Sequence, residues 1–157
     1  MDSQIKIYLE RAENELLLAK KVKILTENTE FKTMLEIPSN TTFYSAVINH
    51  SYYSIFYCAK ALLLTKGIKT RSPEIHKKTF EKFEKEFVNT GILDYKLLEI
   101  YKKNIIKADF LLEIFKDEKW KRGNFTYKTI PGANREPAEE SVNNAILFLK
   151  NVSKMIN

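Results

Sequence analysis

Apolar residues recur every three or four positions in five stretches of the chain, which is the spacing of one face of an α-helix. The predicted helices run from Ser3 to about Asn28, over Phe43–Lys66, from Ser72 to about Asn89, from Asp94 to about Phe115, and from Pro137 to the C-terminus. With only four Gly and four Pro, the sequence is poor in the residues that break helices. The pattern therefore predicts an all-α protein.

Polar residues at the starts of these stretches are candidate N-caps, and glycines mark two of the ends. The expected caps are Ser3, Thr41 or Thr42, Ser72 and Asp94, and the expected stops are Gly67 and Gly91. Between the first two helices, residues 29–40 are interpreted as a connector with a short turn around Phe31–Leu35.

The second predicted helix is apolar on nearly all sides. Such a helix is either central in a bundle or shared with a partner subunit. The other helices carry one apolar face each, with Phe80, Phe83 and Phe87 on the third and Leu97, Tyr101, Ile105 and Ala108 on the fourth.

Residues 116–135 interrupt the helical pattern. Six basic residues meet only two acidic ones there, with three aromatic residues among them, and Gly123, Pro131 and Gly132 argue against one continuous helix. Lysine and arginine can neutralise phosphates while an exposed tryptophan stacks on a base. The alternative is that Trp120 and Phe125 simply fold this basic loop onto the bundle.

The composition is that of one ordinary globular domain over residues 1–157. Apolar residues make up 44% of the chain and charged residues 29%, with a net charge of +6. This modest excess fits an anionic partner or plain solubility. Cys58 is the single cysteine, so no internal disulfide can form and a cytoplasmic location is expected. We expect no metal site, no cofactor and no secretory signal. We also expect no membrane span, because the apolar run 52–64 is short and contains Lys60.

The run Ile48–Leu64, INHSYYSIFYCAKALLL, resembles the Ala-Tyr-Tyr-Ala-x-Phe-Tyr-x-Ala-Lys-Ala-Leu-Leu helix of stand-alone HEPN proteins. Further matches follow at the spacing of that family, namely Gly67, Ile68, His76, Phe83, Phe87, Val88, Gly91, Leu93 and Asp94. The resemblance covers roughly residues 5–115 and the last helix. It implies a four- to five-helix up-and-down bundle, usually a homodimer. Family members are often encoded beside a nucleotidyltransferase as toxin–antitoxin pairs, and many cut RNA without a metal.

The resemblance also implies where an active site would lie. Family ribonucleases typically place an arginine near the end of the fourth helix, followed by a histidine or by Ala-Asp-Tyr, and two subunits bring their arginines together. The matching residues here are Ile105–Phe110, IIKADF, with Ile105 in the arginine's place and Phe110 in the tyrosine's. Isoleucine supplies neither a proton acceptor nor the positive charge that a phosphorane needs.

Arg71 and His76 have the Arg-x4-His spacing of many of these ribonucleases, and the pair straddles Ser72-Pro73. We interpret them as a loop arginine beside a first-turn histidine. His50, on the buried helix, is interpreted as a hydrogen-bonded core or interface residue.

The sequence therefore predicts a HEPN-like homodimer that binds RNA, a nucleotide or a nucleotidyltransferase partner. Two alternatives stay open: a metal-independent ribonuclease that uses Asp109 with Arg122 or Lys103, and a non-catalytic adaptor. The candidate binding residues are Lys102, Lys103, Lys107, Asp109, Trp120, Lys121 and Arg122, of which Asp109 and Arg122 are also the candidate catalytic residues. The candidate dimer residues are His50, Tyr52 and Tyr53.

Overall fold

A computed structural model describes the backbone of residues 2–116 and 130–157 and the side chains of residues 2–108 and 135–157. The helices are α1 (Ser3–Glu27), α2 (Thr29–Met34), α3 (Tyr44–Thr65), α4 (Ile75–Phe83), a π-helical turn η1 (Glu84–Val88), α5 (Tyr95–Lys116) and α6 (Ile130–Ile156). Within the described ranges there is no strand. The predicted all-α class is confirmed.

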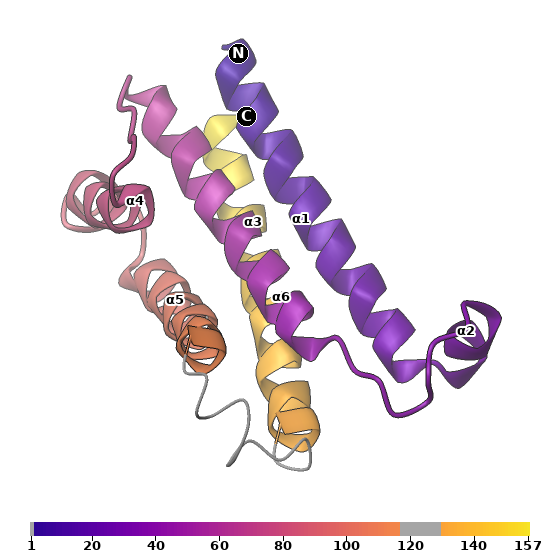
Figure 1. Cartoon of the computed structure of the whole chain (residues 1–157). Helices are drawn as coiled ribbons and strands as arrows, with labels where there is room; N and C mark the ends of the chain where they lie inside the picture. Colours follow the sequence, from indigo (N-terminus) through magenta and orange to yellow (C-terminus); the bar gives the residue numbers. More distant parts are fainter. Residues whose placement is uncertain (1, 117–129) are drawn as a thin grey trace.

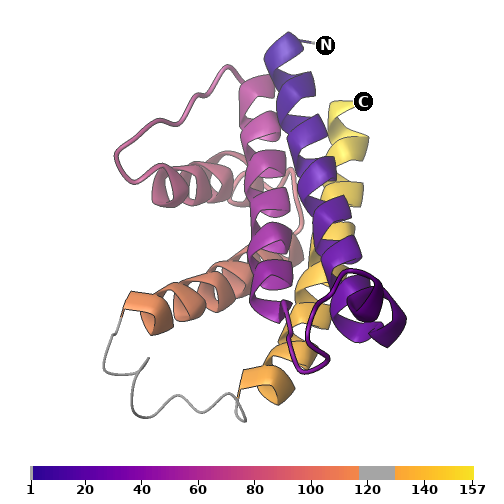
Figure 2. The same ribbon diagram turned by 45° about the vertical axis from the view of Figure 1, so that its right-hand side comes forward.

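Three long helices, α1, α3 and α6, lie side by side, and both chain ends are at the same end of this group (Figure 1). In the second view, α4 and α5 run across α3 rather than along it (Figure 2). The buried faces of α1, α3, α5 and α6 form one core, which Phe83 and Phe87 complete from α4 and η1. The predicted apolar stripes therefore do meet in a common interior.

The central position of α3 explains its sequence. It packs against α1, α4, α5 and α6, so it has almost no side left for water. Ala61, Leu62 and Leu63 are at most 1% exposed although, as consecutive residues, they point about 100° apart around the helix. Of the two explanations that the sequence allowed, burial within one chain accounts for this helix.

Several predicted helix boundaries are wrong in detail. Asp2, not Ser3, caps α1, because its side chain accepts a hydrogen bond from the Gln4 backbone N–H. Neither α3 nor α4 has a side-chain cap, so Thr41, Thr42 and Ser72 do not serve as caps. Tertiary packing, rather than a capping hydrogen bond, stabilises these helix starts. The cap by Asp94 is confirmed, since its carboxylate accepts from the Lys96 backbone N–H at 2.9 Å.

The last helix begins at Ile130, earlier than predicted, and contains Pro137. The expectation of an irregular loop through residues 130–135 is therefore wrong. Pro131 falls in the first turn, where a helix N–H has no acceptor in any case, so the missing donor costs nothing there. The rest of the predicted basic loop, residues 117–129, lies outside the described residues.

No described helix is long and apolar enough to cross a membrane. Cys58 is fully buried on α3, and that burial raises the pKa of its thiol well above the ordinary value.

Candidate functional site

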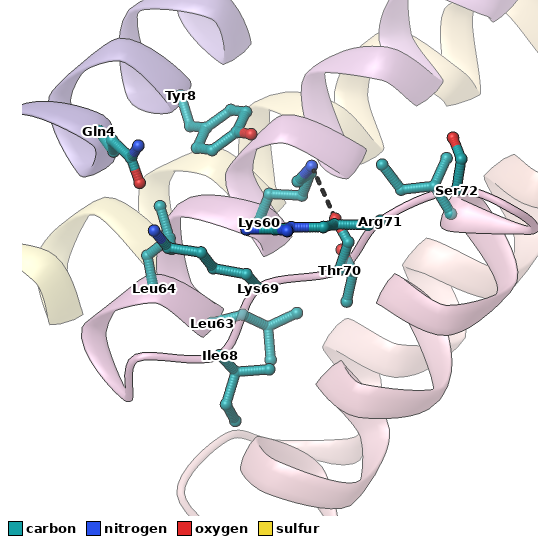
Figure 3. A pocket seen from close by; sticks show the side chains of 11 residues that line it. Gln4, Tyr8, Lys60, Leu63, Leu64, Ile68, Lys69, Thr70, Arg71 and Ser72 are labelled. Carbon is teal, nitrogen blue, oxygen red and sulfur yellow. Dashed lines mark hydrogen bonds between the residues drawn. The ribbon is translucent and has the colours of Figure 1, made fainter.

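A pocket of about 370 Å³ opens between the N-terminal part of α1, the C-terminal part of α3 and the loop that joins α3 to α4. Gln4 and Tyr8 come from α1, Lys60 comes from α3, and Lys69 and Arg71 come from the loop (Figure 3). The floor is apolar and consists of Leu63, Leu64, Ile68 and Ile75. Segments far apart in the sequence thus form one concave site.

The local backbone explains how the loop reaches the pocket. Gly67 ends α3 with φ +70°, a left-handed conformation that glycine adopts without the steric cost of a side chain. Further along, the buried Thr70 hydroxyl is 2.7 Å from that of Thr79 on α4. This hydrogen bond ties the loop to α4, so the side chains on either side of Thr70 project from a fixed point.

Lys60 is held in place by three contacts. Its Nζ donates to the Thr70 carbonyl at 3.4 Å and lies 4.8 Å from the centre of the Tyr8 ring. The centre of the Phe56 ring is 5.7 Å from the same nitrogen. Cation–π contacts of this kind orient an ammonium group without neutralising its charge.

The pocket is positively charged. Lys60, Lys69 and Arg71 line it, and no aspartate or glutamate is among its lining residues. Lys69 and Arg71 are exposed, whereas Lys60 is half-buried. Arginine offers a planar fork of donors to a phosphate and lysine a compact charge. This arrangement is suited to bind a phosphate or another anion.

His76 lies near this pocket on the first turn of α4, among aromatic residues. Its Nδ1 is 2.6 Å from the Tyr52 hydroxyl, and its ring centre is 4.3 Å from that of Phe56. Since Phe56 also contacts Lys60, one aromatic side chain separates the histidine from the pocket lysine. His76 is therefore linked to the pocket through Phe56 and Lys60, while Arg71 lines the pocket itself.

The lysines that the sequence proposed on α5 lie elsewhere. Lys102 and Lys103 are exposed to solvent. Lys107 forms an ion pair with Glu140 of α6 at 2.9 Å, and the hydrogen bond from Lys107 lowers the pKa of that carboxyl group. Lys107 thus links two helices. Ile105, in the position expected for an arginine, packs against the core as its apolar stripe predicted.

The side chains of the remaining candidates, Asp109, Trp120, Lys121 and Arg122, lie outside the described residues. Their roles stay predictions. No group of three potential metal ligands occurs among the described His, Cys, Asp and Glu residues.

The candidate dimer residues have contacts within the chain. His50 Nδ1 is 2.5 Å from a carboxylate oxygen of Glu15 on α1, as expected for a hydrogen-bonded histidine. Tyr52 is buried and contacts His76, while Tyr53 is 38% exposed. Tyr53 is thus the candidate most available to a partner.

Sequence reasoning missed most of the pocket. Lys60 looked like a charge within an apolar run, and Tyr8 and Lys69 carried no signal at all. The one available signal was the Arg-x4-His spacing, which we interpreted as a loop arginine beside a first-turn histidine, and both placements are confirmed. The structure shows Arg71 on the wall of a basic pocket, which that interpretation did not anticipate.

Comparison with known proteins agrees with the helical fold. A model of the HEPN domain matches residues 30–155. The protein named "Putative toxin MJ0605" of Methanocaldococcus jannaschii is 31% identical over 98% of this chain and 89% of its own length. "Putative toxin MJ0142" of the same organism is 39% identical, over half of this chain and 55% of its own length. A UPF0332 protein of Pyrococcus horikoshii is 45% identical over 30% of this chain and 31% of its own length. No solved structure matches the chain significantly.

Proposed function

The chain belongs to the HEPN domain family, and from that premise we propose that it is a toxin-like protein that binds RNA, with an RNA phosphate in the pocket around Lys60 and Arg71. The observation that carries the proposal is a concave site with three cations and no lining carboxylate. The two relatives named as toxins support the biological role.

The charges favour a polyanion over a neutral ligand. A neutral ligand in the pocket would displace water from the three cations and supply no negative charge in its place. This desolvation of the cations costs free energy. A phosphodiester supplies that charge and accepts several hydrogen bonds. Tyr8 and Gln4 add an aromatic ring and an amide on the α1 side, which suits a ribonucleotide better than inorganic phosphate.

A direct test compares the pocket with the α5 lysines. Binding of a fluorescein-labelled single-stranded RNA is measured by anisotropy at low salt for Lys69→Gln/Arg71→Gln and for Lys102→Gln/Lys103→Gln. Each double variant removes the same charge from exposed positions. We expect about tenfold or greater weakening for the first pair and little change for the second. The reverse result would place binding on α5 and refute the proposed site.

A second candidate function is metal-free RNA cleavage, which the Arg-x4-His spacing favours together with Arg71 in the pocket and a contact of His76 with Phe56 beside Lys60. In that reaction the 2′-hydroxyl loses its proton to a base and its oxygen bonds to phosphorus. The bond to the 5′-oxygen breaks, and that oxygen takes a proton as it leaves. His76 is suited to the proton transfers, and Arg71 to stabilising the phosphorane charge.

The cleavage hypothesis has its own assay. RNA is incubated with the protein in EDTA, and the products are resolved on a denaturing gel beside His76→Asn, Arg71→Gln and Asp109→Ala variants. Loss of cleavage in the first two variants supports this site, whereas loss only in Asp109→Ala would assign the reaction to α5. Intact RNA with the wild-type protein would leave RNA binding as the activity.

A homodimer and a nucleotidyltransferase partner remain part of the proposal. Of the dimer candidates, Tyr52 is buried, whereas His50 and Tyr53 are both partly exposed. Light scattering of the purified protein tests the dimer, and co-purification with the product of a neighbouring gene tests the partner. A monomer at all accessible concentrations would contradict the first expectation.

A further inference from the structure

The pocket continues along α1 and α3 as two facing rows of side chains. Gln4, Tyr8, Arg11 and Glu15 follow one another on α1 at helical spacing, and His50, Tyr53, Tyr57 and Lys60 do so on α3. The pairs across the two helices are Lys60 with Tyr8, Arg11 with Tyr57, and His50 with Glu15. Because the two helices run in opposite directions in Figure 1, the rows match from end to end.

Three tyrosines in these rows form what we call the tyrosine track: Tyr8, Tyr57 and Tyr53. The Tyr8 and Tyr57 rings are stacked with centres 6.1 Å apart and planes 19° apart, and Tyr57 and Tyr53 have centres 6.3 Å apart and planes 28° apart. At these separations, near-parallel rings are offset and overlap little. Neighbouring rings of the track therefore cover one another only in part, and Tyr53 also contacts Tyr52, Phe56 and His76.

The track lies at the surface, with Tyr8 on α1 and Tyr57 and Tyr53 on α3. Tyr53 is 38% exposed and Tyr8 and Tyr57 are half-buried, whereas Tyr52 and Phe56 on the same helix are below 9% exposed. The three rings thus remain partly open to solvent where α1 and α3 meet, although most aromatic residues of α3 are in the core. Such a row is suited to contact flat, apolar ligand surfaces.

Cations accompany the rings along the track. Lys60 lies over Tyr8, and the Arg11 guanidinium carbon is 5.4 Å from the Tyr57 ring centre. The acid in these rows, Glu15, is at the far end and already contacts His50. Alternation of stacking rings with positive charge is the pattern by which proteins hold unpaired nucleotides.

We propose that the tyrosine track binds the bases of single-stranded RNA next to the phosphate in the pocket, with Arg11 contacting the following backbone. This inference rests on the proposed function and adds the strand type and the path of the RNA. Stacking needs exposed base faces, which a duplex does not offer.

A second copy of the chain fits the track less well. In a two-fold symmetric dimer the same patch would face itself. Arg11 and Lys60 of both copies would then lie in one interface, and like charges gathered across an interface oppose association. A single RNA strand brings the opposite charge together with the aromatic rings.

The test uses tyrosine substitutions on the folded protein, with circular dichroism as the folding control. Tyr53→Leu and Tyr57→Leu remove a ring but keep an apolar side chain, Tyr53→Phe keeps the ring, and Tyr95→Leu is an exposed control on α5. Anisotropy is measured with single-stranded RNA, with duplex RNA of the same length, and with an abasic ribose-phosphate oligomer.

For single-stranded RNA we expect a loss of about fivefold or more in each leucine variant and wild-type affinity in Tyr53→Phe and Tyr95→Leu. Duplex and abasic oligomers should bind more weakly, and the leucine substitutions should not change their affinity. The slope of affinity against salt should also stay constant, because stacking releases no counterions.

Three results overturn the inference. Unchanged single-strand affinity in both leucine variants, with weakening by Arg71→Gln, would refute the track and leave the pocket standing. If Tyr53→Leu converts a dimer to a monomer without loss of RNA affinity, the track is an interface between copies. If neither wild type nor any variant binds RNA, the proposed function fails as well.

Discussion

Removal of one pocket charge gives a quantitative test of the phosphate site. Arg71→Gln keeps a polar side chain at an exposed position, so no core contact is lost. Three cations line the pocket, and if each meets one phosphate of a single strand, the logarithm of the association constant falls with the logarithm of salt at a slope of about −2. The variant should show a slope of about −1.4.

The same relation sets the loss of affinity. At 0.1 M salt one phosphate contact contributes about fivefold to single-strand binding, so Arg71→Gln should bind about fivefold more weakly there. The difference should shrink toward zero as the salt approaches 1 M.

The assay is an anisotropy titration at four or more salt concentrations. Lys20→Gln, which removes an exposed charge from another face of α1, is the control for net charge. An equal change of slope in both variants would show that RNA senses only the overall charge, and the reasoning about the pocket would be refuted. An Arg71→Gln slope equal to that of the wild type would refute it as well.

Three further substitutions test features of the fold around the site. Asn104→Leu should raise Tm by roughly 2–12 °C in a melting experiment, because neither amide atom of the buried Asn104 has a partner among the described residues and an unpaired buried group costs about 1–3 kcal/mol; a lower Tm would show that the amide is hydrogen-bonded after all. Glu140→Gln should lower Tm at pH 7 and leave Tm unchanged in strong acid. The pKa of this carboxyl group in the folded state is below the ordinary 4.5, so the ionised group stabilises the fold above that pH, and the stabilisation is lost as the group is protonated. A difference in Tm that persists at low pH would contradict the role of Lys107. Gly67→Ala should lower the free energy of unfolding in urea by about 1–2 kcal/mol, because the φ of residue 67 is +70° and the added methyl would contact no atom within 4 Å. An unchanged free energy of unfolding would contradict this strain.

Much of the fold follows from the sequence because its signals are local. An apolar residue every three or four positions makes a helix with one buried face, so the stripe through Tyr101 and Ala108 and the stop at Gly67 were predictable. Helix starts were harder to predict, because a cap contributes a single side-chain hydrogen bond. Asp2 and its neighbour Ser3 are both residue types that can make this bond, so the sequence did not distinguish them. The early start of α6 at Ile130 was missed because Pro131 and Gly132 look like breakers anywhere but in a first turn.

The chain alone also determined the family, because the tyrosine-rich run of α3 and the spacing that follows it are specific patterns. It did not determine the candidate site. Lys60, Tyr8 and Arg71 come from an inner helix, an outer helix and a loop, and nothing in their spacing says that they meet. Tertiary packing brings α1 beside α3 and folds the α3–α4 loop over both. A pocket depends on distances across the fold, whereas a helix depends on distances along the chain, and for that reason only the structure placed the cations together.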